Sequence, residues 1–130
     1  CLILLCDEDI GVGVPNALYG VGYDARSIVG MSWGGKPDEF WLTKAGQLDF
    51  LVLSCNKKML KVKAERDTIV PSRVGIVFLT TGEEHPPTVL MRLLRKWSDL
   101  ELLWNTTERP FAQFLFSNNH LSQTFRDFSL

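Results

Sequence analysis

The sequence has no excess of positive charge, no long hydrophobic run and no low-complexity segment. Its 14 Lys and Arg residues are balanced by 15 Asp and Glu residues, which gives a net charge of −1. This balance argues against double-stranded nucleic acid as the main ligand, because phosphate neutralisation needs a basic surface. A membrane-spanning helix needs about 20 apolar residues. The apolar start, Cys1–Cys6, is far shorter, so we expect no membrane span.

The length of 130 residues fits one domain, residues 1–130, since two would each be too small to hold a core. The chain begins at Cys1 rather than at a methionine, so we expect it to be excised from a longer protein. Hydrophobic residues make up 45% of the sequence and charged residues 22%, which is typical of globular domains and argues against disorder.

Cysteine and histidine are too scarce to indicate a metal or redox site. The three cysteines, Cys1, Cys6 and Cys55, include no C-x-x-C pair. We interpret them as small core residues in a reducing compartment. His85 and His120 are the two histidines, and a metal site would need more ligands at suitable spacing. We therefore predict no metal and no cofactor.

Two weaker chemical signals remain. The acidic cluster Asp7–Asp9 is similar to a cation-binding segment, although a solvated loop is the simpler interpretation. Nucleophilic catalysis by Cys55 with His85 would require the fold to bring them together. A G-x-S-x-G elbow, a P-loop and a complete dinucleotide-binding fingerprint are all missing from the sequence. We therefore predict a non-catalytic domain. The alternative of a catalytic carboxylate pair stays open, because the fold could bring any two of the fifteen acidic residues together.

Hydrophobic patterns predict strands in the middle of the chain. The glycine-rich first third indicates short strands and turns, with a first buried strand near Cys1–Cys6. Leu48–Cys55 and the alternating segment Lys58–Glu65 predict a hairpin around the turn at Asn56 and Lys57. Val74–Thr80 is a continuous apolar run that predicts a central strand covered on both faces.

A long helix and a shorter one are predicted in the last third. Pro86 and Pro87 suit a first helical turn. An apolar stripe follows, and we expect the helix to end between Leu100 and Trp104. The stripe consists of Val89, Leu93, Trp97 and Leu100. Phe111–Phe116 predicts a strand, and Leu121, Phe125 and Phe128 predict a small C-terminal helix. The expected fold class is α+β: an antiparallel sheet with one long helix packed on it and a small C-terminal helix.

Aromatic side chains are plentiful, with eight Phe, four Trp and two Tyr. Flat side chains from separate segments can stack a nucleobase, and a methylated cationic base adds a cation–π contribution. The candidates are Trp33, Trp41, Trp104, Phe111, Phe114 and Phe116. For each one alone, ordinary core packing is the simpler interpretation, and we assign Trp97 to the core outright.

The order of segments between Lys44 and Trp97 resembles a known viral family. It runs Lys-Ala-Gly-Gln-Leu-Asp-Phe-Leu-Val-Leu, then Lys58-Met-Leu-Lys-Val-Lys, then Arg73-Val-Gly-Ile-Val-Phe-Leu-Thr-Thr-Gly-Glu-Glu, then the helix. This order resembles the cap-binding middle domain of the orthomyxovirus polymerase basic subunit 2, in a divergent, thogotovirus-like form. The segment Phe114–Phe128 is similar to the end of that domain. A related alternative is the smaller cap-binding domain of bunya- or arenavirus polymerases.

The resemblance implies a non-catalytic module of an RNA polymerase that holds the 7-methylguanosine cap of host mRNA for cap-snatching. It implies other polymerase subunits and capped RNA or m7GTP as partners, a monomeric isolated domain, and a place in the host nucleus or cytoplasm and in the virion. The matching positions carry Ser54 and Cys55 instead of a stacking residue, and Lys57 to Met59 instead of the guanine-reading glutamate. Arg73 matches the family's basic residue.

Two hypotheses follow from this resemblance. In the first, the cap site is degenerate and the domain serves as a structural module. In the alternative, an aromatic sandwich of Trp33 or Trp41 against Phe111 or Phe114, with Arg73 nearby, binds the cap. The first predicts that these aromatics are buried, and the second predicts that they are open to solvent.

Overall fold

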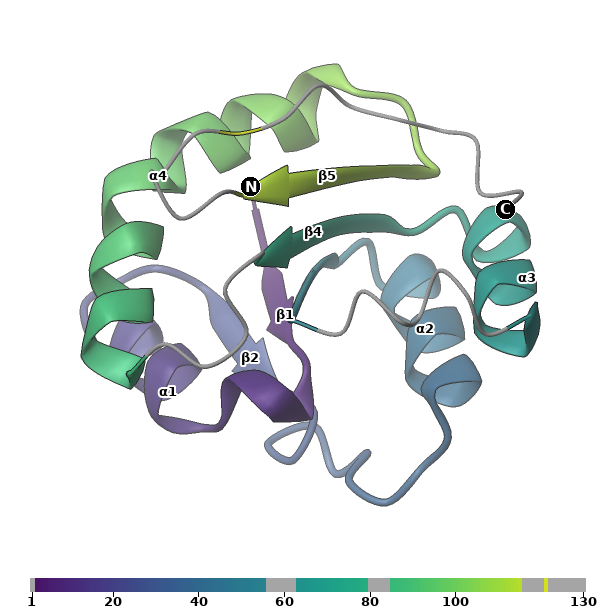
Figure 1. Ribbon diagram of the computed structural model, residues 1–130, viewed down its shortest axis with the longest axis horizontal. Helices are drawn as coiled ribbons and strands as arrows, with labels where there is room; N and C mark the ends of the chain where they lie inside the picture. The colour runs from purple at the N-terminus through teal and green to yellow at the C-terminus, as the bar shows by residue number, and fades with distance from the viewer. Residues whose placement is uncertain (1, 56–62, 80–84, 116–120, 122–130) are drawn as a thin grey trace.

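The computed structural model describes residues 2–55, 63–79, 85–115 and 121, which form a single five-stranded sheet flanked by helices (Figure 1). The strand order is β2-β1-β3-β4-β5, and every neighbouring pair is parallel. In this register Leu5 of β1 lies opposite Val52 of β3. The strands are β1 (Leu4–Cys6), β2 (Ala25–Ser27), β3 (Leu51–Ser54), β4 (Gly75–Leu79) and β5 (Phe111–Leu115).

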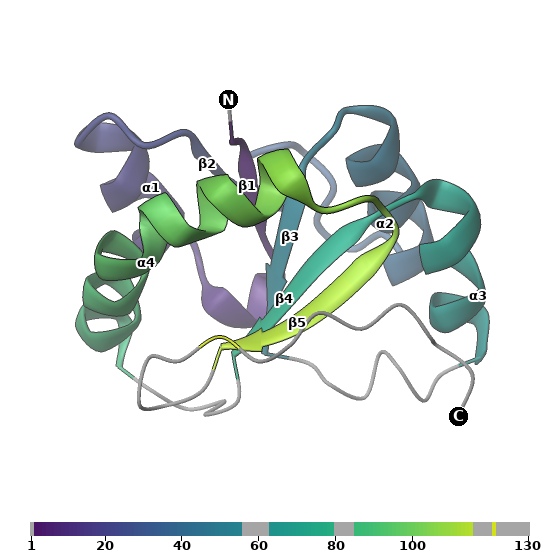
Figure 2. The same ribbon diagram turned by 90° about the horizontal axis from the view of Figure 1, so that it is seen from above.

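Helices cover both faces of the sheet and make the fold a three-layer α/β sandwich (Figure 2). α1 and α4 lie on one face, and α2 and α3 lie on the other. The helices are α1 (Gly13–Gly20), α2 (Asp38–Gln47), α3 (Lys63–Ser72) and α4 (Pro86–Thr106), with a short 3-10 helix, η1 (Glu8–Ile10), after β1. Among the described helices, none is long and apolar enough to cross a membrane.

The predicted antiparallel sheet is wrong. Parallel strands require a crossover connection, and here a helix connects each strand to the next. The expected hairpin is wrong for the same reason: Lys63–Glu65, assigned to its second strand, begins α3. Residues 58–62 of that predicted strand lie outside the described residues. A lysine-rich segment with alternating apolar residues fitted a strand, but the tertiary structure places its end in a helix.

Several predicted elements are confirmed. β1 lies within the apolar start of the chain, and β4 lies between two strands with every residue buried. α4 begins at Pro86, as the paired prolines indicated, and buries Trp97 in the core, but it ends at Thr106, beyond the expected end between Leu100 and Trp104. β5 matches the strand expected after Pro110. Short, continuously apolar strands are typical of parallel sheets that are covered on both faces.

The first third of the chain differs from its prediction, because two helices replace most of the expected strands and turns. α1 buries Val14 and Leu18, and α2 buries Trp41, Leu42 and Ala45. Short helices with glycine near their ends carry a weak periodic signal, so packing against the sheet decides their structure. The predicted C-terminal helix lies outside the described residues, except that Leu121 forms an isolated antiparallel bridge with Leu115.

Alternating strand residues supply two apolar cores, one on each face of the sheet. On one face Leu4, Leu53 and Val77 pack with residues of α1 and α4. On the other face Leu5, Val52 and Ile76 pack with residues of α2 and α3. Burying each such side chain stabilises the fold by about 1.5–3 kcal/mol. This double-sided core fixes the strand ends, where the functional side chains lie.

Candidate functional site

The candidate site lies at the carboxyl ends of β1 and β3, which are neighbours at the centre of the sheet. After β1 the chain continues into η1 and α1 on one face, whereas after β3 it continues to α3 on the opposite face. This divergence is the topological switch point of an open α/β sheet, where such folds bind their ligands.

Asp7 is the central side chain of this edge and directly follows β1. It is 7% exposed, which corrects the interpretation of Asp7 as part of a solvated loop. One carboxylate oxygen, Oδ2, accepts a hydrogen bond from Ser54 Oγ at 2.8 Å. The other, Oδ1, accepts one from the Glu8 backbone N–H at 2.6 Å. The carboxylate of Asp7 is thus fixed by groups from β3 and η1.

Asp7 carries an unfavourable charge in this position. Burial, with the nearby negative charge of Asp9, raises the pKa of the Asp7 carboxyl to about 6, although the hydrogen bonds from Ser54 and Glu8 oppose the shift. Asp38 adds a smaller contribution in the same direction. A carboxylate that is buried beside other carboxylates favours the protonated form unless a cation compensates it.

Asp9 and Asp38 extend the acidic group around Asp7. Burial raises the pKa of the Asp9 carboxyl, hydrogen bonding to the Cys55 backbone opposes this, and the charge of Asp38 raises it further. Asp38 begins α2, and its Oδ1 accepts a hydrogen bond from Trp41 Nε1 at 3.0 Å. Three carboxylates from two segments therefore interact electrostatically at one edge of the sheet.

A buried arginine brings positive charge to the same edge. Arg92 of α4 is 6% exposed and donates from Nη2 to the Leu115 backbone oxygen at the end of β5, at 3.1 Å. Burial lowers the pKa of its guanidinium, while the Cys55 thiol opposes that shift. An arginine remains charged at neutral pH in spite of such a shift, so Arg92 can attract an anionic group near the end of β3.

The cysteines at this edge are poor nucleophiles. Burial, with the charges of Asp9 and Asp7, raises the pKa of the half-buried Cys55 thiol to about 11. Burial also raises the pKa of the Cys6 thiol well above its usual range. Thiol reactivity depends on the thiolate, so this environment disfavours catalysis by Cys55. Cys6 is a core residue as expected, Cys55 is only half-buried, and Cys1 lies outside the described residues.

The donor set suits a hard cation with an open coordination sphere. Within the described segments, no group of three or more His, Cys, Asp or Glu side chains is arranged to enclose a metal ion. Mg²⁺ does not require such an enclosure, because it commonly binds one or two carboxylates and keeps water and substrate phosphate oxygens as its other ligands. Asp7 and Asp9, whose charges interact, are the candidate pair for this role.

The aromatic candidates from the sequence lie mainly in the two cores. Trp41 is 1% exposed and Phe111 is fully buried, and they belong to cores on opposite faces of the sheet. Trp33 is half-buried and packs edge-to-face on Phe40, with ring centroids 6.3 Å apart. Phe114 is half-buried and contacts Phe78, with ring centroids 5.8 Å apart. Trp33, Trp41 and Phe114 belong to the same core. The ring contacts given above join Trp33 to Phe40 and Phe114 to Phe78, and they do not join one candidate to another.

Arg73, the basic candidate, is exposed and lies just before β4, at the amino edge of the sheet and away from Asp7. Arg73 and Phe111 both adjoin the amino end of the sheet, because Phe111 pairs with Gly75 in register. A cap-binding domain, with a functional or a degenerate site, stays a prediction. The expected antiparallel fold that accompanied it is not the fold observed.

Sequence reasoning named the acidic cluster Asp7–Asp9 as similar to a cation-binding segment but preferred a solvated loop, and it did not consider Asp38. A signal was available: Asp7 comes directly after a buried apolar run, and Asp38 follows Pro37 at a helix start. Acidic residues after a strand gain meaning once neighbouring strands are parallel, because their carboxyl ends then meet at one edge. Neighbouring antiparallel strands end at opposite edges, so the predicted antiparallel sheet did not lead to this inference.

Comparison with known proteins assigns no family to the chain: no family model matches it, and neither a curated protein nor a solved structure shows significant similarity to it.

Proposed function

We propose that the protein is a divalent-cation-dependent phosphoesterase whose site is the carboxyl edge of β1 and β3. The observation that carries this proposal is the buried Asp7 carboxylate, held beside Asp9 and Ser54 at the topological switch point. Clustering uncompensated carboxylates costs stability, and a bound Mg²⁺ or Mn²⁺ would offset that cost.

Carboxylates at such an edge support phosphate chemistry because they can hold a divalent cation. A divalent cation held by Asp7 and Asp9 would supply charge stabilisation at a phosphoryl oxygen and would lower the pKa of a bound water. In the overall reaction, a water oxygen forms a bond to phosphorus, the P–O ester bond breaks, and the ester oxygen leaves with a proton while the water's other proton goes to solvent. Asp38 lies close enough to interact electrostatically with both carboxylates.

The substrate proposed is a single strand of RNA. Glu8 and Asp9 are exposed, so this edge is open to solvent on the side of η1, which suits an extended strand better than an enclosed small molecule. The buried guanidinium of Arg92 adds positive potential near the end of β3, which favours a backbone phosphate at this edge without direct contact. The net charge of −1 agrees with contact at a few phosphates rather than binding along a duplex.

The test is cleavage of a fluorescent single-stranded RNA by the full chain with Mg²⁺ or Mn²⁺, and with EDTA. We expect cleavage with either metal, none with EDTA, and a loss of about 100-fold or more in Asp7→Asn, because a metal ligand is removed. Asp99→Asn is the matched control, since Asp99 is an exposed residue of α4 that pairs with Lys96 at 3.2 Å. Cleavage that persists in EDTA, or that Asp7→Asn leaves unchanged, would contradict the proposal.

A further inference from the structure

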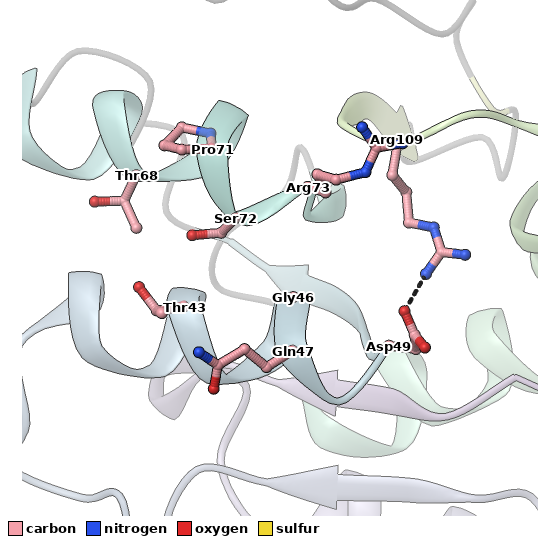
Figure 3. A pocket seen from close by; sticks show the side chains of 9 residues that line it. All are labelled: Thr43, Gly46, Gln47, Asp49, Thr68, Pro71, Ser72, Arg73 and Arg109. Carbon is pink, nitrogen blue, oxygen red and sulfur yellow. Dashed lines mark hydrogen bonds and ion pairs between the residues drawn. The ribbon is translucent and has the colours of Figure 1, made fainter.

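A second polar pocket lies at the opposite, amino edge of the sheet, between the ends of α2 and α3 and the start of β5. Its volume is about 550 Å³, within the usual range for small-molecule sites. Figure 3 shows the hydroxyl groups of Thr43, Thr68 and Ser72 at one end of this pocket. The side chains of Arg73 and Arg109 lie at the other end.

Positive charges outnumber negative charges at the arginine end of the pocket. Arg109 Nη1 contacts Asp49 Oδ1 at 2.9 Å, which forms an ion pair. The second lining guanidinium, that of Arg73, leaves the described lining with a net positive charge. Both arginines also line an adjacent pocket of about 310 Å³, together with Glu108. One carboxylate therefore lies with two guanidinium groups in the larger pocket, and this excess of positive charge favours a further anion there.

Arg109 is held in place before any ligand arrives. Its guanidinium carbon lies 3.9 Å from the centre of the Trp104 ring, in a cation–π contact, in addition to the pairing with Asp49. The two contacts restrict a long side chain that would otherwise lose entropy on binding. The pocket thus holds a preorganised planar donor, of the type that recognises phosphate.

The backbone at this end is strained. Asp49 and Arg73 have φ values of 59° and 57°, and each lies just beyond the end of a helix. Glycine is the favoured residue at such positions because it adopts positive φ without steric cost. Two of the three described non-glycine residues with positive φ line this one pocket. Strained residues concentrate at binding sites, where their side chains are needed.

We propose that this pocket binds the phosphate monoester of a hydroxylated small molecule, such as a sugar phosphate or a nucleoside monophosphate. The phosphoryl group lies between Arg73 and Arg109. The hydroxyl groups of the ligand reach Thr43 and Ser72, which can donate and accept hydrogen bonds. Because the pocket and Asp7 lie at opposite edges of the sheet, the inference is independent of the proposed phosphoesterase activity.

The test is isothermal titration calorimetry of the full chain, in EDTA, with AMP, ribose 5-phosphate and inorganic phosphate. EDTA removes the cation on which the other edge depends. We expect at least one ester to bind more tightly than inorganic phosphate, and Arg73→Gly to weaken that binding about tenfold or more. Arg73→Gly is expected to stay folded, which thermal unfolding checks, because glycine accepts the positive φ at this position.

Arg95→Ala and Asp7→Asn are the matched controls. Arg95 is an exposed arginine of α4 that does not line the pocket, and Asp7 lies at the other edge. Both variants should bind the ester as the unmodified protein does. The proposal is overturned if neither ester binds at millimolar concentration, if inorganic phosphate binds as tightly as the esters, or if Arg73→Gly binds unchanged.

Discussion

At the residue scale, Asp7 is placed where function and stability oppose each other. Its folded-state pKa of about 6 lies above the ordinary value of 3.8, so the folded protein holds this proton more tightly than the unfolded chain does. Below about pH 4 the Asp7 carboxyl is protonated in both states and does not change the free energy of unfolding. As the pH rises from about 4 to about 6, ionisation in the unfolded chain lowers the free energy of unfolding. Above that pH the ionised carboxylate costs about 3 kcal/mol in the absence of a cation.

Asp7→Asn is consequently expected to stabilise the metal-free protein at neutral pH. The amide carries no charge, and its oxygen can still accept one of the two hydrogen bonds. We expect the free energy of unfolding in EDTA to rise by about 1–3 kcal/mol at pH 7.5, with the difference vanishing near pH 4. Urea unfolding across this pH range measures it. A variant less stable than the unmodified protein at pH 7.5 would show that the carboxylate is already compensated.

At the element scale, the close approach of α2 and α3 depends on Gly46. A Cβ atom at this position would overlap the Ser72 backbone oxygen, and backbone cannot move aside as a flexible side chain can. Gly46→Ala should therefore lower the free energy of unfolding by about 2–3 kcal/mol, as overpacking does. Urea unfolding provides the measurement.

Gly20→Ala is the matched control for that substitution. Gly20 ends α1 and has open space where a Cβ would lie. Alanine there should be neutral or stabilise by up to about 1 kcal/mol, since it favours helix over glycine. Equal stability of the two variants would contradict the packing account of α2 and α3.

The elements that sequence patterns predicted are those with strong local signals. β4 is a five-residue apolar strand, and α4 has an apolar stripe and two prolines at its start. α1 and α2 are short, and their burial depends on a sheet formed by distant residues. The direction of strand pairing is likewise non-local, because β1 pairs with both β2 and β3 through contacts that no short window contains.

The sequence indicated Asp7–Asp9 as an acidic cluster, but the full acidic site could not be predicted for the same reason. Asp7, Ser54 and Asp38 are far apart along the chain, and only the parallel pairing of β1 with β3 brings Asp7 and Ser54 to hydrogen-bond distance. The aromatic candidates Trp41 and Phe111 were chosen by residue type, and the fold places both inside its cores.

At the scale of the whole molecule, a net charge near zero conceals two edges of different character. The carboxyl edge gathers Asp7, Asp9 and Asp38, whereas the larger pocket at the amino edge is lined by Arg73 and Arg109 with the single carboxylate of Asp49. A cation is favoured at the first edge and a phosphate ester at the second. The sheet separates the two, so each can be tested while the other is left unchanged.

Titration of the isotopically labelled protein with Mn²⁺, followed by paramagnetic broadening of backbone amide signals, tests the central claim most directly. The account predicts selective broadening around Asp7, Asp9, Asp38 and Cys55, with the signals near Arg73 and Arg109 unaffected, and loss of the effect in Asp7→Asn. Broadening elsewhere but not at the carboxyl edge, or broadening there that Asp7→Asn leaves unchanged, would contradict it.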